Sequence, residues 1–309
     1  MRVILSGGSG LIGTALTASL AGDGHEVIVL SRSPDWVVGL PKNARAVKWD
    51  GITAQGWGHL ADGADVIVNL AGENLAGNIP FGMRWTAKRK ERILNSRVNA
   101  GNAVVEAVRA AKVKPKVLIQ ASAIDIYGRN HPADMTEDSP AGDGFLAEVC
   151  QKWEAASAEI EDMGVRRVII RTALVFDDRD GVLPWMVLPF QMYVGGPIGS
   201  GDQRISWIHI DDEVAAIRFL MDTETAKGIY NLSAPEVITY KAFGRVVGQT
   251  LGKPSYFPTP GFPFKLAFGE AASLLLDGLG VVPERLEQAG FKFQFPTARL
   301  ALQDLYSKN

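Results

Sequence analysis

The sequence of 309 residues has almost none of the residues that build disulfides or metal centres. Cys150 is its one cysteine, whereas an internal disulfide needs two. The four histidines stand apart, at positions 25, 59, 131 and 209, and none has a partner at the spacing of metal ligands. We therefore expect a protein that folds without disulfides and holds no metal.

A surplus of charge and a long apolar run are also missing. The formal net charge is −2, which argues against nucleic acids and anionic membranes as partners. The longest mostly apolar stretch, residues 264–282, contains Lys265, Glu270 and Asp277, which argues against a membrane-spanning helix. The chain begins with a strand-like run, "MRVILSGG", and not with the pattern of a signal peptide. We expect a cytoplasmic protein, the alternative being an organelle protein whose cleaved transit peptide is missing from this sequence.

Short runs rich in valine and isoleucine alternate with helical patterns in the first part of the chain. These runs are nearly continuous, which is typical of strands covered on both faces of a parallel sheet. The alternation indicates an α/β fold with a doubly wound parallel sheet. The expected strands are 2–6, 26–31, 45–49, 65–71, 116–122 and 166–171, and the expected helices are 11–22, about 84–111 and 144–163.

The stretch "LSGGSGLIG" joins the first strand to the first helix. Its glycines are spaced G-x-x-G-x-x-G: one for a tight turn, one for close approach of a pyrophosphate, and one for packing of the helix on the sheet. The free N–H groups at the start of the helix would bind the phosphates. The motif predicts a Rossmann-type dinucleotide site formed by Gly7, Ser9, Gly10, Leu11, Ile12 and Gly13.

The end of the second strand indicates which dinucleotide binds. A carboxylate there would accept a hydrogen bond from the adenosine ribose and favour NAD(H), but the sequence has Ser31 and Arg32 instead. A guanidinium flanked by hydroxyls suits a 2′-phosphate. We expect NADP(H) to be favoured over NAD(H), the alternative being that Arg32 is a solvated loop residue.

The strand and helix pattern loosens after residue 172. We expect residues 1–172 to form the NADP(H)-binding Rossmann domain, with a strand and a helix returning to it near 205–235. Residues 173–309 form the substrate side. A loop-rich pocket wall is expected at 183–212, followed by a helix at 212–222 and a strand in "GIYNLSA". A small helical C-terminal domain is expected at about 255–304.

Several segments resemble, in order and spacing, the extended short-chain dehydrogenase/reductase superfamily, the NAD(P)-dependent epimerases and dehydratases. These segments are "KWD", "NLAGENL", "ASAIDIYG", "RTALVF" and "WIHIDD". A narrower resemblance, through "RWTAKRKERILNSRV", "FLAEVCQKWEAA" and the C-terminal "GFPFKLAFGEAASLLLDGLGVVPERLEQAGFKFQFP", is to an atypical branch, the epimerase-family proteins labelled cell-division-inhibitor (SulA) like. Members of this branch generally have no established substrate.

The resemblance implies further cofactor contacts. Asp50 should meet the adenine, and the segment after the fourth strand should lie beside the nicotinamide half. The residues expected there are Leu70, Ala71, Gly72 and Glu73, and Leu174 follows the sixth strand. Glu73 could also act on a substrate or order its loop.

The resemblance also implies a catalytic Ser/Thr and a Tyr-x-x-x-Lys pair, whose spacing of four places both side chains on one helix face. Ser122 stands at the Ser/Thr position. Counting back from Glu154, the lysine position is Cys150 and the tyrosine position is Leu146. Neither residue can do this chemistry, and Lys152 should face elsewhere. We interpret Cys150 as a packed core residue and not a nucleophile.

Other polar residues are weaker candidates for chemistry. Arg97 could supply a cation to the nicotinamide ribose or phosphate, or be a surface arginine. Tyr127 more often shapes the pocket than transfers protons. Arg204, Trp207 and His209 lie where relatives form the substrate wall, so that His209 could donate a proton. The alternative is structural, with Asp211 or Asp212 capping the next helix.

The sequence therefore supports an NADP(H)-binding oxidoreductase or epimerase of unknown small-molecule substrate, which lacks the usual acid/base pair. The alternative is a non-enzymatic NADP(H)-binding regulator of cell division or redox state. A homodimer is left open.

Overall fold

The computed structural model describes residues 1–75 and 84–307. Its centre is a seven-stranded, fully parallel sheet with the order β10-β6-β5-β4-β1-β2-β3, so that the predicted doubly wound α/β fold is confirmed. The strands are β1 (Arg2–Ser6), β2 (Glu26–Ser31), β3 (Ala44–Lys48), β4 (Val66–Asn69), β5 (Val117–Ala123), β6 (Arg166–Thr172) and β10 (Gly228–Leu232).

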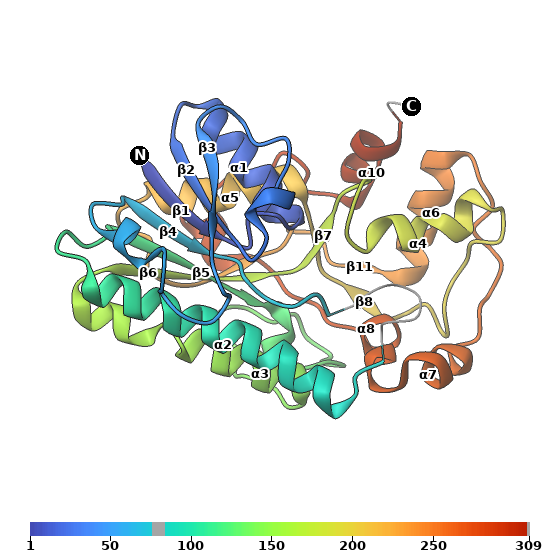
Figure 1. The fold of residues 1–309 in the computed structure, drawn as a ribbon. Coiled ribbons are helices and arrows are strands. Elements are labelled where there is room, and N and C mark those ends of the chain that lie inside the picture. Colours follow the sequence, from blue (N-terminus) through green and yellow to red (C-terminus); the bar gives the residue numbers. More distant parts are fainter. Residues whose placement is uncertain (76–83, 308–309) are drawn as a thin grey trace.

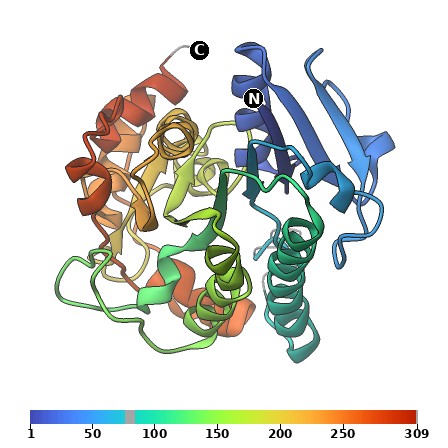
Figure 2. The same cartoon turned by 90° about the vertical axis from the view of Figure 1, so that its left-hand side faces the viewer.

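Helices cover both faces of the sheet, which explains why its strands are apolar throughout. On one face Val3 and Leu5 of β1 pack with α1 (Leu11–Gly22) and α5 (Ile210–Asp222). On the other face Ile4 packs with α2 (Ala87–Ala110), which runs beside α3 (Phe145–Ala155) (Figures 1 and 2). Successive residues of one strand are thus buried on opposite sides.

The rest of the chain forms a third core, between α4 (Leu183–Gln191), α6 (Tyr240–Leu251) and α10 (Ala298–Tyr306), to the right of the sheet in Figure 1. Two small sheets join it to the main one: β7 (Leu174–Phe176) with β9 (Trp207–His209), and β8 (Arg204–Ile205) with β11 (Ile238–Thr239). The remaining helices are α7 (Phe262–Phe268), α8 (Ser273–Leu276) and α9 (Glu284–Gln288), with short 3₁₀ helices η1 (Pro34–Trp36), η2 (Gly58–Ala61), η3 (Ile124–Tyr127), η4 (Ala158–Met163) and η5 (Gly269–Ala272).

Two expectations about elements are wrong. The segment expected as loop after residue 172 contains α4, a helix with Pro189 inside it, because Leu183, Val187 and Phe190 bury one face in the third core. The helix expected over 144–163 breaks into α3 and η4. Arg167 donates to the Glu154 carbonyl (2.8 Å) at the end of α3, where the helical ladder would otherwise continue.

Within the described residues, no helix is both long and apolar enough to cross a membrane. The strand and helix that follow residue 172 do join the main sheet, since β10 pairs with β6 and α5 packs beside α1. The proposed domain boundary at 172 stays a prediction.

Glu213 of α5 is fully buried beneath the sheet. Its Oε1 accepts a hydrogen bond from Thr172 Oγ1 (2.8 Å), whereas Oε2 has no partner among the described residues. Burial raises the pKa of Glu213 to about 8, so that the folded protein holds a proton that the unfolded chain releases near pH 4.5.

Stability should therefore fall as the pH rises from about 4.5 to 8. In this window the free energy of unfolding falls by up to about 1.4 kcal/mol per pH unit, because the folded state keeps Glu213 protonated and the unfolded chain does not. We expect Glu213→Gln to flatten the pH profile of the free energy of unfolding, measured with urea between pH 5 and 8. Glu224→Gln, at an exposed position, is the control. Parallel profiles for wild type and Glu213→Gln would contradict the assignment.

Candidate functional site

The turn after β1 has the shape that the glycine motif predicts. Gly7 has a φ of +73°, and a Cβ there would lie 2.8 Å from the Leu70 carbonyl. A Cβ at Gly13 would overlap the Gly7 carbonyl oxygen. Gly10 precedes α1 without a side-chain cap, and the first turn of α1 has no acidic residue. Unpaired N–H groups and the helix dipole are therefore open to an anion, while Ser9 is exposed and Leu11 and Ile12 are half-buried.

Two cations lie at the ends of β2 and β3. Ser31 pairs in register with Lys48, whose Nζ contacts the Arg32 carbonyl oxygen, and the Arg32 side chain passes beside Gly51. Lys48 was not predicted as a site residue. Lys48 reaches the site because the strand register places it across from Ser31. The sequence alone does not give this register.

Asp50 is tied into its own loop. Its carboxylate accepts hydrogen bonds from the Ile52 and Thr53 N–H groups (2.7 and 2.8 Å) and from Thr53 Oγ1 (2.7 Å). Slight burial would raise its pKa, but these hydrogen bonds outweigh it and lower the pKa of Asp50 below the ordinary value. The carboxylate shapes the loop beside the two cations without forming an ion pair with either in the described structure.

The segment after β4 is held from β1 and from α2. The Leu70 N–H donates to the carbonyl oxygen of Ser6 in β1 (3.2 Å), and the Glu73 N–H donates to Ser96 Oγ in α2 (2.9 Å). The Glu73 carboxylate pairs with Arg92 (3.1 Å), so that it faces α2. Ala71 is buried and Gly72 is exposed. The role of Glu73 toward a substrate stays a prediction.

Arg97 is a buried cation next to this segment. Its Nη1 donates to the carbonyls of Glu73 (3.1 Å) and Ile93 (3.0 Å), and its guanidinium lies 4.9 Å from the centre of the Trp153 ring. A Cβ at Gly72 would stand 3.2 Å from Nε and Nη2. Burial lowers the pKa of Arg97, and no carboxylate in the described part of the chain lies within ion-pair distance of it. The guanidinium is not a surface group.

The face of α3 that should carry the tyrosine and lysine is apolar. Cys150 is 3% exposed, and burial raises the pKa of its thiol to about 12, which leaves the thiol un-ionised. Leu146 packs near Trp85, in a cluster that α2, α3 and η5 share. Lys152 is exposed and pairs with Glu148 (2.6 Å), as expected from its position on the helix.

Ser122 and Tyr127 belong to one buried polar network. Ser122 Oγ donates to Glu154 Oε1 (2.6 Å), and Arg171 forms two hydrogen bonds with the same carboxylate (2.9 and 3.0 Å). Arg171 also donates to the Tyr127 hydroxyl (2.9 Å), which in turn donates to Asn231 (2.7 Å). Burial raises the pKa of Tyr127. The network holds both hydroxyls, and their catalytic roles stay predictions.

His209 caps α5, in place of the aspartates that we expected. Its Nδ1 accepts a hydrogen bond from the Asp211 N–H (3.1 Å), so that in the neutral ring the proton is on Nε2, which lies 3.7 Å from Asp304. The Asp212 carboxylate instead accepts hydrogen bonds from the backbone of Gln294 and Phe295. Burial lowers the pKa of His209.

His209, Asp211 and Asp304 lie close enough to share a metal ion. Nδ1 of the neutral ring is occupied as the acceptor of the Asp211 N–H, however, and the protonated Nε2 has no hydrogen-bond partner among the described residues. The arrangement therefore suits a helix cap better than a ligand set. Trp207, two residues before His209, is fully buried and stacked on Phe176, which makes it a core residue and not part of a substrate wall.

The segment after β6 returns to the glycine turn. Leu174 is half-buried and donates its N–H to Ser206 (3.3 Å). A Cβ at Gly181 would stand 3.1 Å from Leu11 Cδ2, at the start of α1. The chain at Gly181 therefore passes close to the expected pyrophosphate position.

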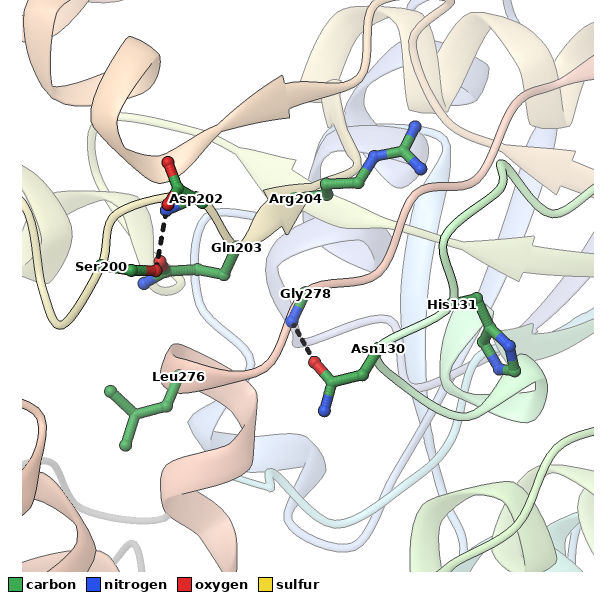
Figure 3. A pocket seen from close by; sticks show the side chains of 8 residues that line it. All are labelled: Asn130, His131, Ser200, Asp202, Gln203, Arg204, Leu276 and Gly278. Atoms are coloured by element: carbon green, nitrogen blue, oxygen red, sulfur yellow. Dashed lines mark hydrogen bonds between the residues drawn. The ribbon is translucent and has the colours of Figure 1, made fainter.

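A cavity of about 290 Å³ lies on the substrate side (Figure 3). Asn130, with a left-handed φ of +63°, is held there by Gly278 through reciprocal hydrogen bonds (2.7 and 3.2 Å). Arg204 pairs with Asp134. The lining is polar, and the charge of its arginine is already balanced. The cavity is lined by Asn130, His131, Ser200, Asp202, Gln203, Arg204, Leu276 and Gly278.

Comparisons with known proteins agree with this geometry. The model of the NAD dependent epimerase/dehydratase family matches residues 3–233, and a domain of unknown function, DUF1731, matches residues 259–305. The epimerase family protein YfhF of Bacillus subtilis is 36% identical, over 99% of this chain and 98% of its own. The bovine epimerase family protein SDR39U1 is also 36% identical, over 99% of both chains.

Solved structures show the same relationship. Human epimerase family protein SDR39U1, solved with NADPH, is 33% identical with a TM-score of 0.88 and full coverage of both chains. A nucleoside-diphosphate sugar epimerase from Corynebacterium glutamicum is 31% identical with a TM-score of 0.77, over 99% of this chain and 58% of its own. UDP-glucuronic acid 4-epimerase from Bacillus cereus, at 13% identity, shares the fold. The chain belongs to the NAD dependent epimerase/dehydratase family.

Proposed function

We propose that this protein is an NADP(H)-dependent oxidoreductase or epimerase that acts on a small molecule without a Tyr-x-x-x-Lys pair. The observation that carries the proposal is the pair of cations, Arg32 and Lys48, at the ends of β2 and β3, where a carboxylate would favour NAD(H). The NADPH in the human SDR39U1 structure supports this choice of cofactor. The epimerase names of the relatives support an enzyme over a non-enzymatic regulator.

The residues divide into an adenosine end and a nicotinamide end. The glycine turn and the N–H groups of α1 would hold the pyrophosphate, while Ser31, Arg32 and Lys48 would hold the 2′-phosphate, with Asp50 shaping the adenine loop. The contacts to the nicotinamide half would come from Leu70, Ala71, Gly72, Glu73, Arg97 and Leu174.

The residues on the inner face of α3 limit the chemistry that this site can do. The cofactor, when bound, donates or accepts a hydride. Neither Leu146 nor the un-ionised Cys150 can move the accompanying proton, which must come from the substrate, water or another side chain. Arg97 supplies from α2 the fixed positive charge that the lysine would supply from α3. Membership of the cell-division-inhibitor-like branch, the cytoplasmic location and a homodimer stay predictions.

The adenosine-end cations should discriminate between the cofactors. We expect Arg32→Ala and Lys48→Ala each to weaken NADPH binding about tenfold or more, because each removes a charge-assisted contact of roughly 1.5–3 kcal/mol, and to leave NADH binding nearly unchanged. Fluorescence titration with both nucleotides measures this. Arg45→Ala, on the same strand as Lys48, is the matched control. Equal losses for NADPH and NADH would refute the assignment.

Arg97 should contribute to binding of the nicotinamide half through its charge. We expect Arg97→Met to raise the Kd for NADPH about tenfold, and Arg97→Lys to raise it less, since the cation is kept. Thermal unfolding of both variants separates this loss from loss of the fold.

Arg109→Met is the control for the Arg97 experiment, because Arg109 lies on the same helix but is exposed and paired with Glu159. A folded Arg97→Met variant that binds NADPH as tightly as the wild type would contradict the role of Arg97.

A further inference from the structure

Arg97 is a buried cation that forms no ion pair within the described part of the chain. The residue is 9% exposed, and its guanidinium contacts neutral groups: the carbonyl oxygens of Glu73 and Ile93 and the ring of Trp153. Residues 76–83, which the structure does not describe, contain no acidic residue in the sequence. A buried charge is costly unless another group offsets it. Arg97 therefore carries an uncompensated positive charge in surroundings shielded from water.

The ionisable groups around this guanidinium add no net charge of their own. Those that act on it are the thiol of Cys150 and the carboxylates of Asp125 and Glu73. Burial raises the pKa of the Cys150 thiol to about 12, so that the thiol is neutral. Asp125 is paired with Arg129, and Glu73 is paired with Arg92 (3.1 Å). Since each acid already has a cation of its own, the group as a whole keeps one positive charge.

This charge lies at the nicotinamide end of the proposed cofactor site. A Cβ at Gly72, in the segment after β4, would stand 3.2 Å from Nε and Nη2 of Arg97. The ionisable side chain with the largest influence on Arg97 is Cys150, which occupies the lysine position on α3, and α3 runs beside α2 (Figure 2). The guanidinium thus stands between the two segments that should contact the nicotinamide half.

A positive charge at this place distinguishes the two redox forms of the cofactor. The nicotinamide ring is positively charged in NADP⁺ and neutral in NADPH, whereas the phosphates are the same in both. The guanidinium of Arg97 would attract the phosphates of both forms but repel only the oxidised ring. Such a repulsion is much stronger in a buried site than in water, because the effective dielectric constant is lower.

We propose that the uncompensated charge of Arg97 selects NADPH over NADP⁺, so that this protein begins its reaction by giving a hydride to its substrate and works as a reductase. This inference rests on the proposed function, since it names the direction of the same reaction. For a carbonyl substrate, the carbon accepts the hydride, the C=O π pair moves to the oxygen, and the oxygen takes a proton from water. NADPH is oxidised to NADP⁺. An epimerase that first oxidises its substrate would instead have to hold NADP⁺.

The preference for the reduced form is measured by calorimetric titration of the full chain with NADPH and with NADP⁺, as the ratio of the two Kd values. We expect the wild type to bind NADPH at least about tenfold more tightly, which raises the midpoint potential of the bound couple by about 30 mV. Arg97→Met should lower the preference about tenfold, and Arg97→Lys should largely keep it. Partial loss of the fold would weaken both nucleotides alike and leave the ratio unchanged.

The neighbouring ion pair gives changes of opposite sign. Asp125→Asn should raise the preference for NADPH several-fold, because it removes a negative charge near the ring. Arg129→Met should lower the preference, because it leaves the Asp125 carboxylate uncompensated. A purely structural role of these side chains would not produce opposite shifts. Arg109→Met, an exposed arginine near the end of α2, is the matched control and should leave the ratio unchanged.

Three results would overturn the inference. They are a wild type that binds NADP⁺ as tightly as NADPH, an Arg97→Met variant with the wild-type ratio, and a fall in the preference on Asp125→Asn. A wild type that binds neither nucleotide would overturn the proposed function instead, so that the two failures are distinguishable.

Discussion

The buried ion pair between Glu154 and Arg171 fixes the position of α3 on the sheet. Its two hydrogen bonds measure 2.9 and 3.0 Å, and both side chains are largely hidden from solvent. Ser122 joins the carboxylate from β5, and Tyr127 joins the guanidinium from η3. Removing one partner would leave a buried charge uncompensated, at a cost of about 3–5 kcal/mol. The network thus holds β5, β6, η3 and α3 in one arrangement.

Because this network holds α3, the helix keeps its place although Leu146 and Cys150 stand where the family resemblance predicts a tyrosine and a lysine. Cys150, one turn before Glu154, packs in the same apolar cluster as Tyr127. Trp153, on the turn between them, offers its ring to Arg97 of α2. The guanidinium therefore approaches the segment after β4 from the second helix and needs no polar residue at position 150. The buried Cys150 on α3 and the buried Arg97 on α2 are therefore compatible parts of one arrangement.

The sequence predicted the features that depend on short stretches of chain. Val3 to Leu5 and the spacing of Gly7, Gly10 and Gly13 were enough for the first strand, the turn and the start of α1. Lys48 could not be found, because its position beside Arg32 depends on strand register. The His209 cap also depends on contacts far along the chain, since Asp212 is taken by residues 294 and 295. The helix at 183–191 packs against α6 and α10. This burial of apolar side chains outweighs the unfavourable effect of proline on helix formation.

Net charge is a poor guide to the charge of individual surfaces. A net charge of −2 excludes a chain that is basic throughout. A bound ligand, however, interacts mainly with the charges within about 10 Å of it, because salt screens charges that lie farther away. Beside Arg32 and Lys48, the nearby carboxylate of Asp50 is occupied by hydrogen bonds from its own loop. Residues 252–268 contain Lys253 and Lys265 and no acidic residue. The acids that balance these cations in the total lie elsewhere, many of them paired with other arginines, so that both regions stay locally positive.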